Sequence, residues 1–286
     1  MRGTIERTGK DAETPYRLPR RFSVTGRALG AVLYRLAAER RRIAIANTVR
    51  AFPELDSALR RRLVQASFAH AGAGVVEALL AFGGHPPARR RFVFRGAEHV
   101  DAALAKGQGV VLLQARFSCL DAAASAIEAR WPVTAVSGFV ADTRVGRFVR
   151  RRRARLLSGI VDNDDLSGML AVLRRGEVLW LCPDVRVPRA RCGFPSSYFG
   201  QRALSSAAPA LLARLTGAAL VPCVPLREGS GYRLQFGAPL STCARTAETT
   251  QRINDLFEAQ VRAAPEQYLW MNRRFEAQSR RRGRFA

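Results

Sequence analysis

The sequence predicts an α/β protein in which a mixed central sheet is flanked by helices and preceded by a helical N-terminal region. Two observations predict this fold. From about residue 91 onward, short apolar runs bounded by Gly, Pro or polar residues alternate with stretches of helical spacing, which is typical of a sheet covered on both faces. Before residue 85 the apolar residues follow helical spacing only.

The N-terminal part is predicted to be a basic arm followed by an amphipathic helix. Residues 1–22 are polar and contain Pro15 and Pro19, so we expect a disordered basic arm there. Between Val24 and about Ala46, apolar residues at helical spacing are separated by arginines. Such a helix packs either on its own domain or on a lipid surface.

A second N-terminal helix is predicted to begin after Asp56, which is a suitable N-cap, and to run to about Phe82. Gly83-Gly-His-Pro-Pro87 then interrupts helical structure. We therefore place the boundary of the helical region, 23–84, at this segment. An α/β domain, 85–275, and a basic tail, 276–286, follow.

The α/β domain is predicted to alternate strands and helices. The expected strands are 91–96, 109–115, 133–139, 159–162, 177–182, 219–225 and 232–237. The expected helices are 97–106, 119–130, 142–156, 166–175, 205–216 and 246–264. Glu228-Gly-Ser-Gly231 is a hairpin signal, so the sheet should end in an antiparallel pair.

Neither a membrane-spanning helix nor a cleaved leader is expected. No uninterrupted apolar stretch has the roughly 18 residues needed to cross a bilayer, and the segment from Leu29 to Ala38 is broken by Arg35. Residues 1–23 lack the apolar core of a signal peptide. The five cysteines show no Cys-x-x-Cys spacing and no neighbouring histidine, so neither a metal site, a disulfide framework nor a cofactor is predicted.

The formal net charge of +24 indicates phosphate-bearing partners. Of the 47 basic residues, all but Lys10 and Lys106 are arginines. A GC-rich genome explains arginine in place of lysine, but not the excess of bases over acids. The positive potential favours an anionic membrane surface or nucleic acid. Nucleic acid is favoured by charge alone, because the sequence has no reading motif and no interleaved aromatic residues.

The chemical candidates begin at the end of the strand 109–115, where Arg116 precedes Asp121 by five residues. Functional side chains of α/β proteins gather at such carboxyl ends. A guanidinium stays protonated and cannot act as a base, so Arg116 either binds a phosphate or carboxylate of a substrate or only neutralises Asp121. Asp121 either supports residue 116 electrostatically, caps the next helix or pairs with Arg116.

Several segments follow one another in an order typical of one protein family. They are Asn47-Thr-Val-Arg-Ala-Phe-Pro-Glu-Leu55, Gly96-Ala-Glu-His-Val100 with Gly107-Gln-Gly-Val-Val111, Arg175-Gly-Glu-Val-Leu-Trp-Leu-Cys-Pro-Asp184, Phe199-Gly200 with Ala203 to Ala208, Leu215-Thr-Gly-Ala-Ala-Leu-Val-Pro222, and Pro265-Glu-Gln-Tyr-Leu-Trp270 with Arg273-Arg-Phe275. From about Arg41 to Phe275 the chain thereby resembles the late acyltransferases of lipid A biosynthesis, within the lysophospholipid acyltransferase family. The resemblance implies a glycerolipid-acyltransferase-like fold.

Three polar positions depart from the family pattern. The family's His-x4-Asp/Glu is Arg116-x4-Asp121 here, and its Asp-x-Asp is Asp184-Val-Arg186. The family's histidine after Tyr-Leu-Trp is Asn272. These differences fall at positions where the resemblance implies catalytic residues. The chain therefore retains the segments typical of the family's fold but lacks the His-acid dyad.

The resemblance implies transfer of a fatty acyl chain from an acyl carrier protein or acyl-CoA thioester to a hydroxyl of a lipid or glycolipid, without metal. With the resemblance, the net charge predicts a protein on the cytoplasmic face of the inner membrane of a Gram-negative bacterium. The amphipathic basic helix and the lack of a spanning segment predict peripheral attachment, which departs from relatives that often have a spanning helix at this end. Arg116, Asp121 and Asp184 are the implied catalytic positions. The alternative is a catalytically degenerate member that binds acyl chains or lipid head groups without turnover.

Further candidates are basic or hydroxyl side chains. Arg186, Arg189 and Arg191 either grip an acidic head group or carrier protein, or form a solvated basic loop. Ser205 and Ser206 are interpreted as N-caps of the helix 205–216, whose amides could also hold an anion. A basic cluster in the helix 142–156 either forms a solvated face or contacts phosphates; its members are Arg147, Arg150 to Arg153 and Arg155.

Overall fold

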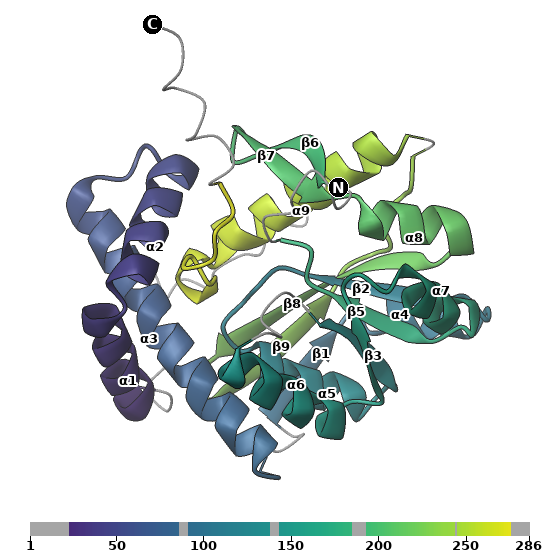
Figure 1. The fold of residues 1–286 in the computed structure, drawn as a ribbon, viewed down its shortest axis with the longest axis horizontal. Helices are drawn as coiled ribbons and strands as arrows, with labels where there is room; N and C mark the ends of the chain where they lie inside the picture. Colours follow the sequence, from purple (N-terminus) through teal and green to yellow (C-terminus); the bar gives the residue numbers. More distant parts are fainter. Residues whose placement is uncertain (1–22, 86–90, 138–142, 185–192, 244, 276–286) are drawn as a thin grey trace, which may run out of the picture.

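The computed structural model describes residues 23–85, 91–137, 143–184, 193–243 and 245–275 (Figure 1). Its centre is a seven-stranded sheet with the strand order β1-β9-β8-β2-β5-β3-β4. The strands are β1 (Phe92–Arg95), β2 (Val110–Gln114), β3 (Val133–Ser137), β4 (Gly159–Asp162), β5 (Val178–Leu181), β8 (Ala219–Glu228) and β9 (Gly231–Phe236). Each predicted strand corresponds to one of these, and the mixed α/β class is confirmed.

The sheet is parallel except where β9 returns beside β8. β2 pairs in parallel with β5 and β8, and β3 pairs in parallel with β4 and β5. The predicted hairpin is present, because β8 and β9 are antiparallel. It does not end the sheet, however, since β1 pairs in parallel with β9 and forms the edge.

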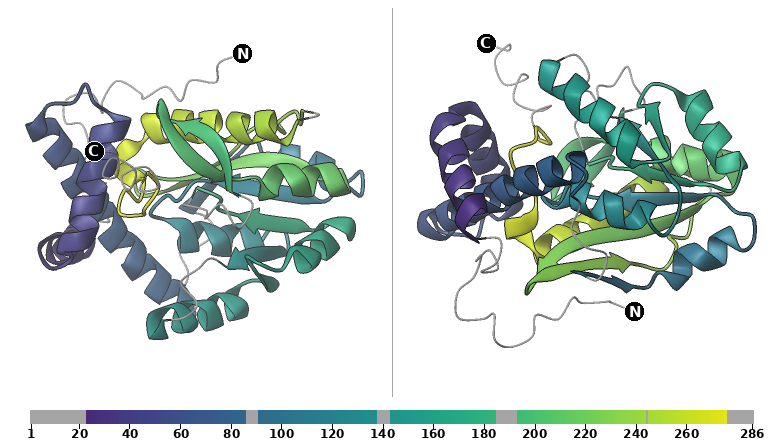
Figure 2. Two further views of the ribbon diagram at one scale, coloured as in Figure 1. Left: turned by 45° about the horizontal axis from the view of Figure 1, so that its top comes forward. Right: turned by 90° about the horizontal axis from the view of Figure 1, so that it is seen from below.

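Helices cover both faces of the sheet, because successive residues of each central strand point to opposite sides. Val110 and Leu112 of β2 pack in one apolar cluster with the alanines of α5, whereas Val111 and Leu113 pack in a second cluster with residues of α2, α3, α7, α8 and α9. Figure 2 shows these two helical layers. The helices of the body are α4 (Glu98–Leu104), α5 (Leu120–Glu128), α6 (Arg144–Leu156), α7 (Leu166–Arg174), α8 (Ala208–Thr216), α9 (Thr246–Ala263) and the short η4 (Pro265–Gln267).

The N-terminal region consists of three helices, α1 (Ser23–Leu36), α2 (Ala38–Ala51) and α3 (Ser57–Phe82). The expectation of one helix from Val24 to Ala46 was wrong, because Ala37 leaves helical geometry with a ψ of 64°. Leu63 and Phe68 of α3 lie in the same apolar cluster as Val111 and Leu113 of β2. The N-terminal helices therefore share a core with the sheet.

The α1 helix packs on α3 through glycines. A Cβ atom at Gly30 would lie 2.5 Å from the carbonyl oxygen of Phe68, so no larger residue fits there. Val24, Val32 and Leu36 of α1 remain exposed. The amphipathic helix thus packs on its own protein with one face and leaves apolar side chains on the other.

The α3 helix begins as predicted, since the Leu59 amide donates to Asp56 Oδ1 at 2.7 Å. By length and composition this 26-residue helix could cross a membrane, which contradicts the expectation that no such helix exists. The polar Gln65, His70 and Glu77 interrupt its apolar run, but the mean hydropathy of the helix remains high enough for a membrane-spanning segment. Of its most apolar window, 56% is buried within the protein, as in a core helix.

A two-stranded hairpin was not predicted. β6 (Gly193–Tyr198) and β7 (Gln201–Ser206) pair in antiparallel fashion and lie against α9 (Figure 1). Phe199 and Gly200 join them with φ angles of 51° and 66°, as a two-residue turn with two left-handed residues requires.

Candidate active site

Arg116 and Asp184 lie together at the carboxyl ends of β2 and β5. Because these strands are parallel neighbours, the residues that follow them emerge at the same edge of the sheet. The amide of Arg116 donates to Asp184 Oδ2 at 2.8 Å, and Arg116 Nε lies 3.4 Å from Oδ1. The Asp184 side chain is fully buried, whereas 25% of the Arg116 side chain is exposed. Arg116 is therefore the more accessible member of this pair.

The buried position of Asp184 changes its acidity. Burial raises the pKa of its carboxyl group, although the positive charges of Arg116 and Arg274 act in the opposite direction. A raised pKa makes a carboxylate a stronger base than an exposed one. Asp184 is accordingly the titratable group of this pair that is able to accept a proton.

Cys182, two residues before Asp184, is not activated for nucleophilic chemistry. Burial raises the pKa of its thiol to about 12. Because the thiolate is the reactive form, this cysteine stays inert at neutral pH.

Asp121 pairs with Arg153 rather than with Arg116. Arg153 of α6 reaches the first turn of α5 and donates from Nε to Asp121 Oδ1 at 2.6 Å and from Nη2 to Oδ2 at 3.1 Å. The side chain of Asp121 is only 15% exposed. Of the three alternatives for Asp121, the ion pair with Arg116 is therefore wrong, because Asp121 pairs with Arg153 and Arg116 pairs with Asp184.

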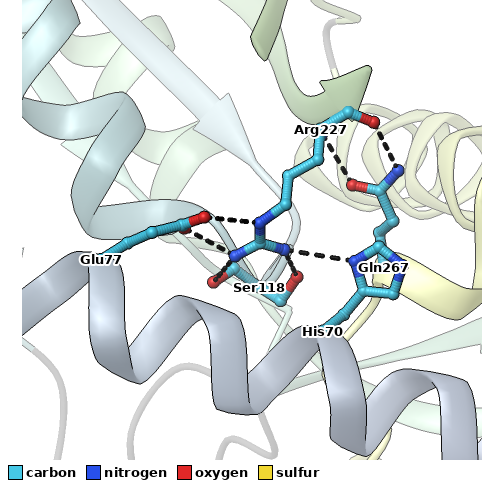
Figure 3. A network of polar contacts seen from close by, with 5 residues as sticks. All are labelled: His70, Glu77, Ser118, Arg227 and Gln267. Atoms are coloured by element: carbon cyan, nitrogen blue, oxygen red, sulfur yellow. Dashed lines mark hydrogen bonds and ion pairs between the residues drawn. The ribbon is translucent and has the colours of Figure 1, made fainter. Parts of the chain in front are cut away.

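A buried polar network holds the loop that carries Arg116 (Figure 3). Arg227 of β8 donates from Nε and Nη2 to the two carboxylate oxygens of Glu77 on α3, at 2.7 and 2.6 Å. Its Nη1 donates to Ser118 Oγ at 2.6 Å, and its Nη2 donates to the Ser118 carbonyl at 3.2 Å. Gln267 exchanges two hydrogen bonds with the Arg227 backbone, at 2.8 and 3.1 Å. One guanidinium thereby joins α3, β8 and the 115–119 loop.

His70 belongs to this network and is neutral. Its Nδ1 lies 3.3 Å from Arg227 Nη1, and because arginine only donates, Nδ1 accepts and the proton sits on Nε2. Burial and the Arg227 charge lower the pKa of His70 well below its usual value. Being buried against Arg227, this histidine does not supply the base that residue 116 lacks.

The close approach of α3 to the loop requires a glycine. A Cβ atom at Gly74 would lie 2.0 Å from the Ser118 carbonyl oxygen, which is inside contact distance. The loop therefore packs directly on the helix backbone between His70 and Glu77.

Segments far apart in the sequence meet at this loop. Asn47 Nδ2 donates to the carbonyls of Trp270 and Asn272, at 2.8 and 2.7 Å. The Leu269 amide donates to the Arg116 carbonyl at 3.0 Å. The motif that begins at Asn47 and the segment after Pro265 thus brace the same corner of the fold.

Ser205 and Ser206 are placed differently from the prediction, because both end β7 and the following helix begins at Ala208. Ser205 Oγ lies in a buried network, where it accepts hydrogen bonds from Arg274 Nη2 and Asn254 Nδ2 at 2.7 and 2.8 Å. It is therefore not an N-cap. Ser206 Oγ accepts from the Ala208 amide at 3.3 Å, at the start of α8.

The remaining predicted ligands are basic residues. Arg186, Arg189 and Arg191 lie outside the described residues. Of the cluster on α6, Arg150 pairs with Asp162 at 3.0 Å and Arg153 with Asp121, so part of it is structural. These two arginines of α6 therefore bind carboxylates of the protein itself.

Sequence reasoning had not assigned roles to Glu77 or Arg227, and it treated Arg153 only as part of the basic cluster of the helix 142–156. Glu77 carried a usable signal, because a single carboxylate in an apolar helix must find a partner when it is buried. Its partner could not be identified, since Arg227 lies 150 residues further along the chain.

Comparison with known proteins identifies the family of the chain. Residues 12–277 match the family model described as bacterial lipid A biosynthesis acyltransferase. The lipid A biosynthesis lauroyltransferase of Escherichia coli (strain K12) is 31% identical over 258 residues, covering 88% of this chain and 84% of that protein. The palmitoleoyltransferase of the same strain is 26% identical over 256 residues, with 88% and 83% coverage. A lipid A biosynthesis acyltransferase of Haemophilus influenzae is 25% identical over 259 residues, with the same coverage. The chain therefore belongs to the bacterial lipid A biosynthesis acyltransferase family.

Proposed function

We propose that the protein transfers a fatty acyl chain from a thioester, carried by acyl carrier protein or coenzyme A, to a hydroxyl of a lipid A-like glycolipid. The family match over residues 12–277 supports the reaction class. The observation that carries the site assignment is the pairing of Arg116 with Asp184 at the carboxyl ends of adjacent strands. There a partly exposed cation lies against a buried carboxylate.

In this reaction the acceptor hydroxyl attacks the thioester carbonyl carbon, the carbon–sulfur bond breaks, and the sulfur leaves as a thiol. The hydroxyl proton must pass to a base, and Arg116 cannot take it. Asp184 is the proposed acceptor, because its pKa is raised and it lies against Arg116. It then returns the proton to the departing sulfur, which completes the thiol. Arg116 is proposed to stabilise negative charge, either on the tetrahedral intermediate or on a phosphate of the acceptor. Asp121, held by Arg153, is proposed to support this charge balance.

The proposed location is the cytoplasmic face of the inner membrane, with peripheral attachment. The net charge of +24 and the exposed Val24, Val32 and Leu36 of α1 support contact with an anionic lipid surface. Arg186, Arg189 and Arg191 are proposed to contribute to head-group or carrier binding.

The test is an acyl-transfer assay with purified protein, an acyl carrier protein or acyl-CoA donor, and a lipid A precursor with a free hydroxyl. We expect slow formation of the acylated glycolipid and its loss in Asp184→Asn. Lipid binding without any product, under conditions in which the Escherichia coli lauroyltransferase turns over, would overturn the proposal in favour of a member that binds lipid only.

A further inference from the structure

Two helices that contact each other, α3 and α6, expose several large apolar side chains. On the C-terminal half of α3 these are Val75, Leu79 and Leu80, which are 43%, 55% and 50% exposed. On α6 they are Val145 and Phe148, which are 69% and 43% exposed. Together these five residues define the α3–α6 surface. Apolar side chains of this size rarely gather on a surface that has no partner.

The two helices form one surface because they contact each other directly. The rings of Phe82 and Phe148 pack edge to face, with centroids 6.3 Å apart. Arg152 Nη1 also donates to the Phe82 carbonyl at 3.3 Å. The end of α3 and the start of α6 are thereby fixed side by side (Figure 1).

Arginines border this surface. Three exposed arginines, Arg144, Arg151 and Arg155, lie on the same face of α6 as Phe148. Their distances from Phe148 along the chain are four, three and seven residues, which is helical spacing. The α6 helix contains no acidic residue of its own. Two neighbouring carboxylates, those of Asp162 and Asp121, are already paired with other arginines of α6.

We propose that the α3–α6 surface docks on an anionic phospholipid bilayer. Aliphatic and aromatic side chains beside arginines match the boundary between acyl chains and phosphate groups. The opposite side of α6 carries Arg153, which holds Asp121. The docking helix therefore contacts the first turn of α5, which follows β2, and docking would place the carboxyl end of β2 near the lipid. The inference deepens the proposed function and rests on its lipid acceptor.

Tryptophan fluorescence offers a direct test. The three native tryptophans, Trp131, Trp180 and Trp270, are at most 5% exposed, so Phe148→Trp adds one exposed indole. The probe is a vesicle of equal parts phosphatidylglycerol and phosphatidylcholine with brominated acyl chains. We expect the added emission to move to shorter wavelength and to be quenched by the bromines.

The matched control is Leu215→Trp on α8, a position that is 51% exposed. Leu212 and Ala213 of α8 pack on the face of the sheet opposite to α5, whereas Leu156 of α6 packs on the α5 side, so α8 lies away from the α6 half of the α3–α6 surface. The control indole should therefore stay in water and show no quenching. Circular dichroism checks that both variants are folded.

Charge is tested separately. Arg144→Gln and Arg151→Gln should each weaken binding to the anionic vesicles about fivefold, since one arginine near such a surface contributes roughly 1 kcal/mol. Arg214→Gln on α8 is the matched control and should change binding little. Vesicles of phosphatidylcholine alone should not distinguish these variants.

Three outcomes would overturn the proposal. One is equal quenching of Phe148→Trp and Leu215→Trp. Another is quenching of Val32→Trp on α1 but not of Phe148→Trp, which would assign docking to α1 alone. The third is a spectral change of Phe148→Trp with acyl carrier protein but not with vesicles, which would make the surface a protein-binding site. None of these measurements requires turnover, so they are separate from the test of the acyl-transfer proposal.

Discussion

Arg153 of α6 binds both carboxylate oxygens of Asp121, at 2.6 and 3.1 Å, so Asp121 pairs with Arg153 rather than with Arg116. Arg116 instead lies against Asp184, across two neighbouring strands. The carboxyl edge of the sheet therefore contains two arginine–aspartate pairs in place of one base–acid dyad. This arrangement decides how substitutions at residue 116 should behave.

We expect Arg116→His to raise the rate of acyl transfer by at least tenfold, because general-base assistance typically contributes about 10²–10⁴-fold. Asp121→Asn in that background should lower the rate again, since an imidazolium needs a carboxylate beside it. Steady-state rates on a lipid A precursor check both steps, and Arg116→Lys is the control for loss of the guanidinium alone. A fast wild-type enzyme that is indifferent to Asp121→Asn would contradict this account.

Removal of Glu77 should destabilise the protein strongly. Glu77→Leu leaves the fully buried Arg227 guanidinium without that carboxylate, and breaking a buried pair in this way costs about 3–5 kcal/mol. Urea unfolding followed by circular dichroism gives the free energy of unfolding. The matched control is Glu177→Gln, which breaks the exposed pair with Arg175 and should change stability little. Similar effects of the two variants would mean that the buried network does not hold α3 in place.

His70 should make the folded state sensitive to mild acid. Its folded-state pKa lies well below the usual 6.5, so the unfolded chain binds a proton first as the pH falls. Stability is complete above about pH 6.5 and is lost as the pH drops from there toward the folded-state pKa, by roughly 1 kcal/mol between pH 7.5 and 5.5. His70→Asn keeps an acceptor near the Nδ1 position but cannot titrate. The variant should therefore lose less stability than wild type over this interval, and an equal loss in both proteins would exclude His70 as the cause.

Membrane attachment should be electrostatic. We expect the protein to sediment with anionic membranes and to be released by high salt, because surface attraction is screened within about 10 Å at 0.1 M salt. Immunoblotting of washed membranes at increasing salt measures the release. If only detergent extracts the protein, a peripheral mode is wrong and insertion of an apolar helix such as α3 becomes the explanation.

Periodicity was sufficient for the sheet and insufficient for the hairpin. The buried runs 110–113 and 178–181 are apolar throughout and therefore indicate strands without reference to their neighbours. β6 and β7 contain Pro195 and several serines, and their turn places Phe199, rather than Asn or Gly, at a left-handed position. Local propensity thus opposed the observed structure, which packing against α9 maintains.

The position of the candidate site in the fold was predictable from the sequence, but the side-chain contacts within the site were not. The corner after β2 and the Pro-Asp corner after β5 follow from strand order, because parallel neighbours share an edge. The choice of Arg153 as the partner of Asp121 depends on how α6 crosses α5, which no local pattern encodes. The same holds for Arg227, whose two partners on α3 are more than 140 residues away in sequence.

The separation between Glu77 and Arg227 also governs the order of events during synthesis. A ribosome that adds about 5–20 residues per second needs roughly 8–30 s to make the 150 residues between them. Throughout that interval α3 is complete, apolar and without the cation that neutralises its buried acid. The helix cannot reach its final position until β8 has emerged, so the packing of α3 against the sheet is a late step. Until then the nascent chain must keep this apolar helix from aggregating.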